Sequence, residues 1–217
     1  MLVGDRMSHP VITVHPELSI QEALFRMRRE KVRRFPVVDK RGHLVGIISE
    51  MDLLEASPSD VSSLSVHELN YLLHKITVDE IMTKDVITVD EDTTIEEAAR
   101  IMVDKKIGGL PVLSKEEVVG IITETDLFKV FFELLGSHEQ GIRISVLVPN
   151  QPGELARLTK AVFDAGGNIL SLGTFLGEST GNREILMTVE NGDLADIKQA
   201  IEPFVEEILD IRETRLV

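Results

Sequence analysis

Hydrophobic residues in two segments of this 217-residue chain recur at the spacing of an amphipathic helix. In each segment the apolar residues fall at i, i+3, i+4 and i+7, which share one face of an α-helix. They are Ile20, Ala23, Leu24 and Met27 in the first segment and Ile95, Ala98, Ala99 and Met102 in the second. Each run begins with a capping box, Ser19-Ile-Gln-Glu22 or Thr94-Ile-Glu-Glu97, whose hydroxyl and carboxylate satisfy N–H groups at a helix start. The pattern predicts two helices with a buried face, in which Met27 and Met102 fill the core.

Short apolar runs on both sides of each helix predict strands. One β-rich run precedes each helix and two follow it. These runs are residues 11–14, 35–38 and 44–48 around the first helix and residues 86–89, 110–113 and 118–122 around the second. Asp39-Lys-Arg-Gly42 is a tight-turn sequence between two of the strands. A further helix is predicted to begin at Ser49 and at Thr123, so each segment has the order β-α-β-β-α.

The same blocks occur twice in the same order. Met7-Ser-His-Pro-Val-Ile-Thr-Val14 returns as Met82-Thr-Lys-Asp-Val-Ile-Thr-Val89, and the block from Val45 to Leu53 returns from Val119 to Leu127. A repeat of roughly 75 residues is a whole supersecondary unit. We therefore expect two units, residues 1–56 and 78–135, that pack sheet against sheet around a pseudo-twofold axis. Residues 57–77 between them are predicted to be a polar linker and an unrepeated helix, capped by Ser65-Val-His-Glu68.

The last third of the chain has a different pattern. Residues 142–148 alternate apolar and other side chains, except that Leu147 is also apolar, and this predicts a strand with one strongly apolar face. A helix containing Leu155, Leu158 and Val162 comes next, and Gly166-Gly167 stops it. The remaining expected elements are strands at 169–176 and 183–189, a helix at 193–204 and a strand at 207–212. This β-α-β-β-α-β order is ferredoxin-like. We expect a hinge at 136–141, a second domain at 142–217 and an α+β fold for the whole chain.

Composition and charge narrow the classes of function. The formal net charge is −14, which argues against nucleic-acid binding by the chain as a whole, because such proteins neutralise phosphates with Lys and Arg. The chain has no Cys, no signal-peptide pattern at its start and no apolar run near the roughly 20 residues that span a bilayer. We expect a cytoplasmic protein that binds neither nucleic acid nor membranes. A basic stretch, residues 26–34, is either a solvated helix face or a rim that faces phosphates.

The duplicated block Gly-Ile-Ile-Ser/Thr-Glu-x-Asp carries the candidate chemistry. Ser49 and Thr123 are placed as N-caps, and Asp52 and Asp126 can close the capping box. The same geometry can serve a ligand, because N–H groups and a hydroxyl at a helix start attract an anion and a nearby carboxylate can accept ribose hydroxyls. Gly46 and Gly120 lack a Cβ, so we expect a flat ligand to approach these strands closely.

The repeat resembles the CBS domain, and the tandem resembles a CBS pair, or Bateman module. The resemblance rests on Met-x-x-x-Val-Ile-Thr-Val, the helix, Phe/Leu-Pro-Val and Gly-Ile-Ile-Ser/Thr-Glu-x-Asp, over roughly residues 1–135. It implies an adenosine nucleotide as a regulatory ligand in the cleft between the repeats and no covalent cofactor. In that family the Ser/Thr contacts phosphate, the Asp contacts ribose, and the segments before Pro and after the first Thr wall the adenine. The positions carried over are Ser49, Asp52, Thr123, Asp126, Thr13, Thr88, Phe35, Pro36, Leu110 and Pro111, with Gly109 beside them.

The two copies differ in charge just before the Phe/Leu-Pro block. The first has Arg33-Arg34 and the second has Gly108-Gly109. Guanidinium groups pair bidentately with phosphates, whereas glycines give room without charge. We therefore predict that any preference for polyphosphates comes from Arg33 or Arg34.

The C-terminal unit resembles an ACT domain, a family that binds small effectors such as amino acids at domain interfaces. The resemblance rests on Pro149-Asn-Gln-Pro-Gly-Glu-Leu155 and on Gly166-Gly-Asn-Ile169. It implies Asn150, Gln151, Gly153 and Asn168 as effector residues. An Asp is usual at the position of Asn150, and its loss removes a partner for an ammonium group, so a dimerisation domain is the alternative. The order CBS pair then ACT, with an Asn70-Tyr-Leu-Leu73 helix between the repeats, resembles acetoin-utilisation proteins of the AcuB type.

The sequence contains no motif typical of catalysis or of metal binding. There is no His-Glu-x-x-His and no phosphate-binding loop, and His67 and His74 are too far apart for the usual i, i+4 metal pair. We expect a non-catalytic regulatory protein that forms at least a homodimer. The alternatives are a partner-docking protein with degenerate ligand sites and, third, a metal-assisted enzyme.

Overall fold

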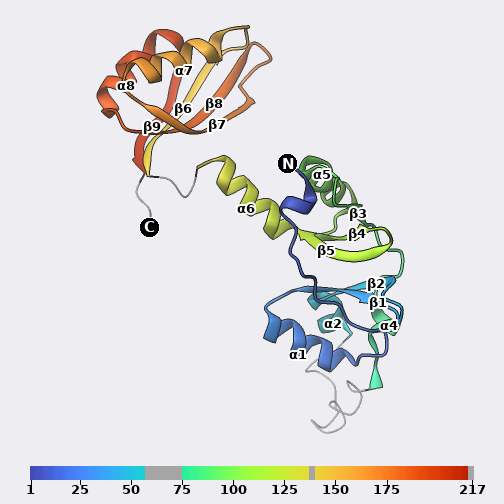
Figure 1. Ribbon diagram of the computed structural model, residues 1–217. Coiled ribbons are helices and arrows are strands. Elements are labelled where there is room, and N and C mark those ends of the chain that lie inside the picture. The colour runs from blue at the N-terminus through green and yellow to red at the C-terminus, as the bar shows by residue number, and fades with distance from the viewer. Residues whose placement is uncertain (57–74, 137–139, 215–217) are drawn as a thin grey trace. The chain divides into compact units, whose positions relative to one another are not determined.

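The computed structural model describes residues 1–56, 75–136 and 140–214 (Figure 1). The chain divides into two compact units, Met1–Leu127 and Phe128–Val217, which are described separately below. Most of the predicted linker and inserted helix, with Ser65-Val-His-Glu68 and Asn70-Tyr-Leu-Leu73, lies outside the described residues. The centre of the predicted hinge, 137–139, lies outside them as well.

The first repeat consists of α1 (Ile20–Glu30), β1 (Arg34–Val38), β2 (Leu44–Ser49) and α2 (Glu50–Glu55). These bounds agree closely with the predicted ones. β1 and β2 form an antiparallel hairpin in which Arg34 pairs with Ser49. The strand expected at 11–14 is reduced to a single bridge between Val14 and Val37.

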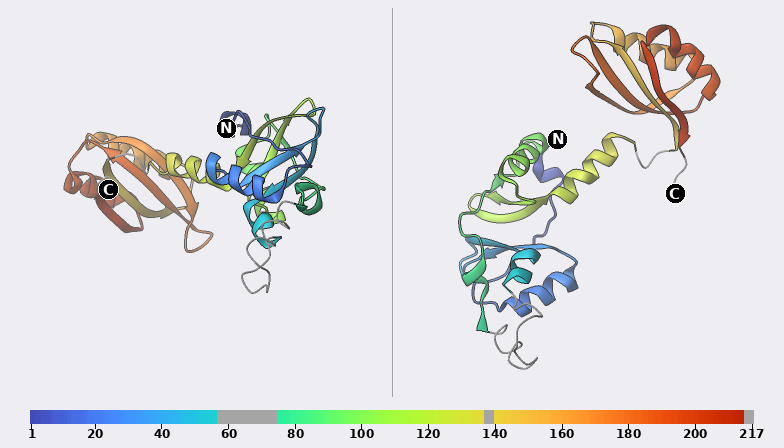
Figure 2. Two further views of the ribbon diagram at one scale, coloured as in Figure 1. Left: turned by 90° about the horizontal axis from the view of Figure 1, so that it is seen from below. Right: turned by 180° about the vertical axis from the view of Figure 1, so that it is seen from behind.

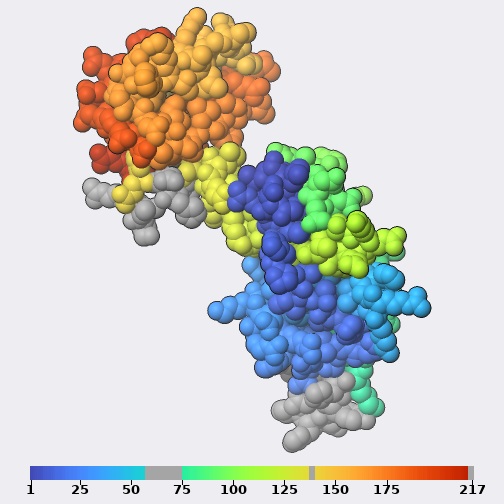
Figure 3. All heavy atoms as spheres, viewed as in Figure 1, coloured from blue at the N-terminus to red at the C-terminus, as the bar shows by residue number. Residues whose placement is uncertain are grey.

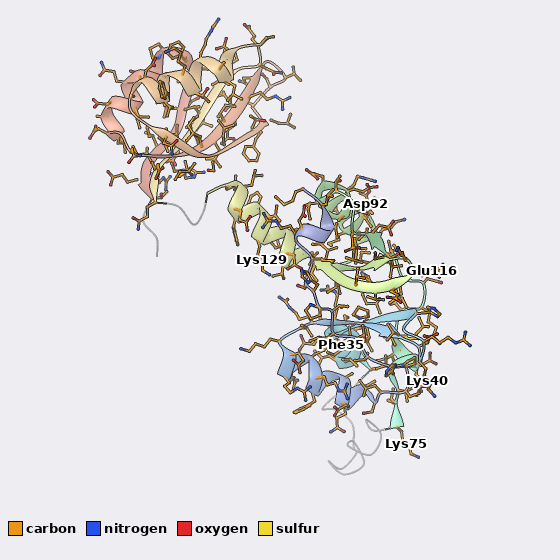
Figure 4. The ribbon with its side chains drawn as sticks, in the orientation of Figure 1. Phe35, Lys40, Lys75, Asp92, Glu116 and Lys129 are labelled. Atoms are coloured by element: carbon orange, nitrogen blue, oxygen red, sulfur yellow. The ribbon has the colours of Figure 1, made fainter. Side chains whose placement is uncertain are left out.

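The second repeat consists of α4 (Val78–Ile81), β3 (Val89–Asp90), α5 (Ile95–Lys105), β4 (Gly109–Ser114), β5 (Glu117–Thr123) and α6 (Glu124–Leu134). β4 and β5 are antiparallel, and β3 adds to β4 in parallel over only two residues. The strand expected at 86–89 is therefore shorter than predicted. The hairpin turns that carry Lys40 and Glu116 lie on the same side of the two repeats (Figure 4), and a bridge joins the adjacent His43 and Glu117.

The segment that opens each repeat packs on the other repeat. The N-terminal segment, with the short 3₁₀ helix η1 (Val3–Asp5), lies against α5 and β5 (Figure 3), and α4 with the residues around it lies against the first repeat. The backbone hydrogen bonds that join them include Val3 N–H to Thr93 O (2.8 Å), Ser8 N–H to Ile121 O (2.9 Å), Val78 N–H to Leu18 O (2.8 Å) and Thr83 N–H to Ile47 O (2.9 Å). Because the exchange is reciprocal, neither repeat is a complete unit by itself.

The N-termini of α1 and α5 lack the full capping boxes that the sequence predicted. The Ser19 and Thr94 hydroxyls accept the N–H of the residue three positions later, at 3.3 Å and 3.2 Å. The Glu22 carboxylate bonds Arg26 instead of returning to the cap. A full capping box forms at Ser49 and Asp52. The two predicted boxes are therefore half-made, because nearby arginines compete for the carboxylates.

The core of the first repeat is formed by the faces that the periodicity predicted. Ile20, Ala23 and Met27 are buried on α1, and Met102 is buried on α5, which confirms both methionines as core residues. The cluster also includes Val78 and Met82 from the exchanged segment. Phe35, labelled in Figure 4, is fully buried within the first repeat.

The second unit has the predicted ferredoxin-like order. It contains β6 (Gly141–Pro149), α7 (Glu154–Asp164), β7 (Asn168–Leu176), β8 (Asn182–Glu190), α8 (Leu194–Ile201), the 3₁₀ turn η2 (Glu202–Phe204) and β9 (Glu207–Thr214). The sheet order is β7-β8-β6-β9, and α7 and α8 cover one face (Figure 2). The alternation in β6 places Ile142, Ile144, Val146 and Val148 in the core against those helices.

No helix within the described ranges combines the length and the apolar character needed to cross a bilayer.

Candidate functional site

A cavity of about 290 Å³ lies between the two repeats, where β1 begins and β2 ends. Its size is near the lower end of the roughly 300–1,000 Å³ typical of ligand pockets. The first repeat contributes one wall and the second repeat the other. The lining residues are Arg34, Ile47, Ser49 and Asp52 from the first repeat and Thr83, Asp85, Val86, Ile87, Lys106, Ile107, Gly108 and Gly109 from the second.

Ser49 and Asp52 are held together by the helix start that the sequence predicted. The Asp52 Oδ2 accepts the Ser49 N–H and the Ser49 hydroxyl, both at 2.7 Å. The Ser49 Oγ in turn accepts the Asp52 N–H at 3.3 Å. The other carboxylate oxygen, Oδ1, has no hydrogen-bond partner among the described residues. One oxygen of Asp52 therefore caps α2, and the other can accept hydrogen bonds from a ligand hydroxyl.

The side chain of Arg34 crosses from the first repeat to the second. A Cβ built on Gly108 would lie 2.9 Å from the Arg34 Cζ, and one built on Gly109 would lie 3.3 Å from its Cδ. The two glycines thus make room for the arginine. The guanidinium has no hydrogen-bonding or ion-pair partner among the residues that the structure describes. A half-buried cation that lines a cavity without a partner favours an anionic ligand.

The second repeat has the same constellation at the start of α6. The Thr123 N–H and hydroxyl both donate to the Asp126 Oδ2, at 3.1 Å and 2.7 Å. Asp126 is 5% exposed, whereas Asp52 is half-buried. Thr123 and Asp126 do not line the 290 Å³ cavity. They mark a separate position, related to the first by the pseudo-twofold repeat.

Four residues of the predicted adenine-binding set lie in the interior. Phe35 and Leu110 are fully buried, and Pro36 and Pro111 are buried too, so their side chains form the interior, and their contact with adenine stays a prediction. The reason is that both faces of these strands are covered, because β1 is buried at every position from Phe35 to Val38 and β4 at every position from Gly109 to Val112.

Other predicted residues have different positions. Gly109 and Arg34 line the cavity, whereas Thr13, Thr88 and Arg33 do not. Sequence reasoning missed most of the second wall, which includes Thr83, Asp85, Val86, Ile87, Lys106 and Ile107. The reciprocal exchange of segments, which juxtaposes these residues with Ser49, has no local sequence signal.

The two strand glycines also have a different role from the one expected. A Cβ on Gly46 would lie 2.9 Å from the Met82 Cγ, and one on Gly120 would lie 2.9 Å from the Met7 Cγ. Each glycine therefore receives the methionine of the exchanged segment and not a flat ligand. The expectation of a close ligand approach at Gly46 and Gly120 was wrong, because the exchanged chain already occupies that space.

The predicted effector residues of the second unit do not come together within one chain. β6 and β7 are both antiparallel to β8. Asn150, Gln151 and Gly153 follow the end of β6, and the Asn150 amide donates to the Thr180 carbonyl at 3.1 Å. Asn168 begins β7 at the opposite end of the sheet and donates to the Glu190 carboxylate at 2.6 Å. A single site built from all four residues is therefore excluded in one chain.

Within the described ranges no group of three or more His, Asp and Glu side chains could hold a metal ion. His67 and His74 lie outside those ranges.

Comparison with known families decides the classification. Residues 3–59 and 78–133, more than half of the chain, match the CBS domain. The chain belongs to the CBS domain family. Residues 140–212 match the TTHA0829-like ACT domain. The chain is thus a CBS pair followed by an ACT-like domain, with the α+β fold expected from the sequence.

Three solved structures are similar to the CBS pair of this chain. The CBS domain pair of protein MJ0100, in complex with 5′-methylthioadenosine and S-adenosyl-L-methionine, is 34% identical, covers 64% of this chain and 98% of that one, and has a TM-score of 0.52. A putative acetoin utilization protein (AcuB) from Vibrio cholerae is 31% identical over 64% of this chain and 95% of that one, with a TM-score of 0.52. CBSX2 in complex with AMP is 31% identical over 61% of this chain and 97% of that one, also with a TM-score of 0.52.

Some curated relatives are enzymes. The L-aspartate semialdehyde sulfurtransferase of Methanocaldococcus jannaschii is 36% identical over 131 residues, 60% of this chain. This chain spans only 23% of that protein. Sequences similar to this CBS pair therefore occur as parts of enzymes.

Proposed function

We propose that this CBS pair binds an adenosine nucleotide in the cavity between its repeats and that the protein regulates a partner without being a catalyst. The observation that carries the proposal is that Arg34 and Asp52 line the same cavity. Arg34 offers an unpaired guanidinium to a phosphate, and Asp52 offers Oδ1 to ribose hydroxyls. A nucleotide carries these two complementary groups at a fixed separation.

The apolar lining residues fit the remaining part of such a ligand. Val86, Ile87 and Ile107 come from the second repeat, opposite Ser49 and Asp52. An adenine ring stacks favourably between aliphatic side chains because apolar surface leaves water. The similar structures with AMP, 5′-methylthioadenosine or S-adenosyl-L-methionine support this class of ligand.

We propose further that the ACT-like unit mediates a homodimer or a higher assembly. β7 and β9 are the edges of its four-stranded sheet, and a sheet edge presents unpaired backbone groups to a second copy. Sedimentation at micromolar concentration is expected to show a species larger than one 24.2 kDa chain. A single species of that mass would reject the assembly. Effector binding by the unit and a role in acetoin utilisation also stay proposals, the latter supported by the AcuB structure.

Equilibrium dialysis of the full chain with labelled ATP, AMP and S-adenosylmethionine tests the nucleotide proposal. Saturable binding of at least one of them, abolished or strongly weakened in a combined Arg34→Gly and Asp52→Asn variant, is the expected result. An absence of binding to all three would favour a partner-docking protein with degenerate sites. Turnover of a bound ligand with Mg²⁺ would contradict the non-catalytic role.

A further inference from the structure

The cavity contains a carboxylate that nucleotide binding does not require. Asp85 lines the wall contributed by the second repeat, next to Val86 and Ile87. It has no ion-pair or hydrogen-bond partner among the described residues, whereas the adjacent Lys84 is paired with Asp79 at 3.0 Å. Asp85 therefore presents an uncompensated negative charge to whatever occupies the cavity.

The charges of this cavity are balanced between the two signs. Arg34 and Lys106 contribute two cations, and Asp52 and Asp85 contribute two carboxylates. Lys106, like Arg34, has no ion-pair partner within the part of the chain that the structure describes. Asp85 and Lys106 are both exposed, at the rim of the cavity. A polyphosphate brings three or four negative charges, and a carboxylate at the rim repels all of them. A ligand tail that carries one positive and one negative group finds an oppositely charged side chain for each of them.

The repeat supplies an internal contrast at this position. The bridges Thr83–Ile47 and Ser8–Ile121 are equivalent in the two repeats, and the residue two positions after each is Asp85 in one and Pro10 in the other. The position related to the cavity by the repeat, near Thr123 and Asp126, therefore lacks the carboxylate. The two positions share their caps and differ in charge.

We infer that Asp85 is a specificity-determining residue that makes the first cavity select against polyphosphate tails and in favour of adenosine ligands with a zwitterionic tail. The inference rests on the proposed function, because it assigns the ligand class of the same cavity. It does not require Asp85 to contact the ribose or the adenine. The Asp85 carboxylate acts on the charge of the tail alone.

The test compares three probes on the full-length protein, the parent and Asp85→Asn, by isothermal titration at low salt. Loss of one unit charge at about 8 Å in a partly screened cleft changes affinity roughly fivefold. We expect Asp85→Asn to bind ATP at least about fivefold more tightly and S-adenosylmethionine about fivefold more weakly, with adenosine unchanged. Binding at the second repeat contributes equally to both proteins, because Pro10 replaces the carboxylate there.

Asp92→Asn is the matched control. Asp92 is an exposed carboxylate of the second repeat that does not line the cavity (Figure 4). This variant has the same change in net charge and is expected to leave all three affinities unchanged. Equal shifts in Asp85→Asn and Asp92→Asn, or shifts of ATP and S-adenosylmethionine in the same direction, would overturn the inference while leaving the proposed function standing. If the parent binds none of the three probes, both the inference and the proposed function are overturned.

Discussion

The two CBS repeats have nearly the same elements and the same capped helix start, but they differ where they meet. The first repeat brings Arg34 to the cavity, and the second brings Gly108 and Gly109, over which the arginine lies. The side chain of one copy thus occupies the space that the other copy leaves empty. This difference teaches that residues which differ between two repeats can contact each other. The role of Arg34 is therefore understood only together with Gly108 and Gly109.

The largest expected effect comes from the residues that the two repeats share. Asp52→Asn should weaken nucleotide binding about tenfold to a hundredfold, because it removes the charge from hydrogen bonds worth roughly 1.5–3 kcal/mol each. The stability of the apo protein should change little, because the amide oxygen introduced at position 52 can still accept the two bonds from Ser49. Titration calorimetry and thermal unfolding of the apo protein measure the two effects.

Asp126→Asn and the double variant extend this test to the second repeat. Asp126 is buried, so its variant should lose more stability than Asp52→Asn. If all three variants bind nucleotide like the parent and only stability falls, the carboxylates are helix caps and the assignment to ribose fails.

The next effect separates the two arginines. Arg34 lines the cavity and Arg33 does not. Arg34→Gly should therefore weaken ATP about tenfold more than it weakens adenosine, because the guanidinium acts on phosphate charge. Arg33→Gly is the matched control for this cavity, and the difference should shrink as salt is raised. Equal losses for ATP and adenosine in Arg34→Gly would show that the guanidinium does not contact phosphate.

A smaller effect tests the room that the glycines provide. Gly108→Ala places a methyl group against the end of the flexible Arg34 side chain, so the guanidinium must move. We expect AMP affinity to fall about threefold to fivefold with little change in stability, on the order of one hydrogen bond. Gly109→Ala, whose added Cβ meets its neighbours at 3.3–3.4 Å, should have a weaker effect. If both variants bind AMP as tightly as the parent, Arg34 does not contact the ligand.

The smallest effect concerns the hairpin turns of the two repeats. The backbone N–H of His43 donates to the Asp39 carboxylate and holds the pKa of Asp39 below its usual range, with help from Arg41 N–H. A lowered carboxyl pKa adds stability above the unfolded-state value of 3.8, and this stability is lost as the pH falls through the folded pKa. Asp39→Ser, which imitates Ser114 of the second repeat, should therefore differ from the parent in melting temperature at pH 6 and converge with it in strong acid. A difference that persists unchanged in acid would show that the carboxylate charge is not responsible.

Much of the fold could be predicted, because the signals are local. The buried face of α1, the cap at Ser49 and the alternation in β6 each depend on residues within one or two turns or a single strand. Prediction was weaker where local groups compete. Glu22 bonds Arg26 rather than returning to Ser19, and the strand expected at 11–14 is a single bridge because that chain continues from a segment that belongs to the other repeat.

By itself, the sequence determined the duplicated α-β-β-α unit, the ferredoxin-like unit after it, and the constellation of Ser49 with Asp52 and Thr123 with Asp126. Only the tertiary structure decided which residues face that constellation. It placed Asp85 and Lys106 opposite Asp52, gave the space at Gly46 to Met82, and set Asn150 and Asn168 at opposite ends of a sheet. The physical reason is that hydrogen-bonded turns and periodic burial are fixed by neighbours in sequence. A cavity between two walls, in contrast, is fixed by the packing of residues 34–52 against residues 83–109, and no local pattern records that packing.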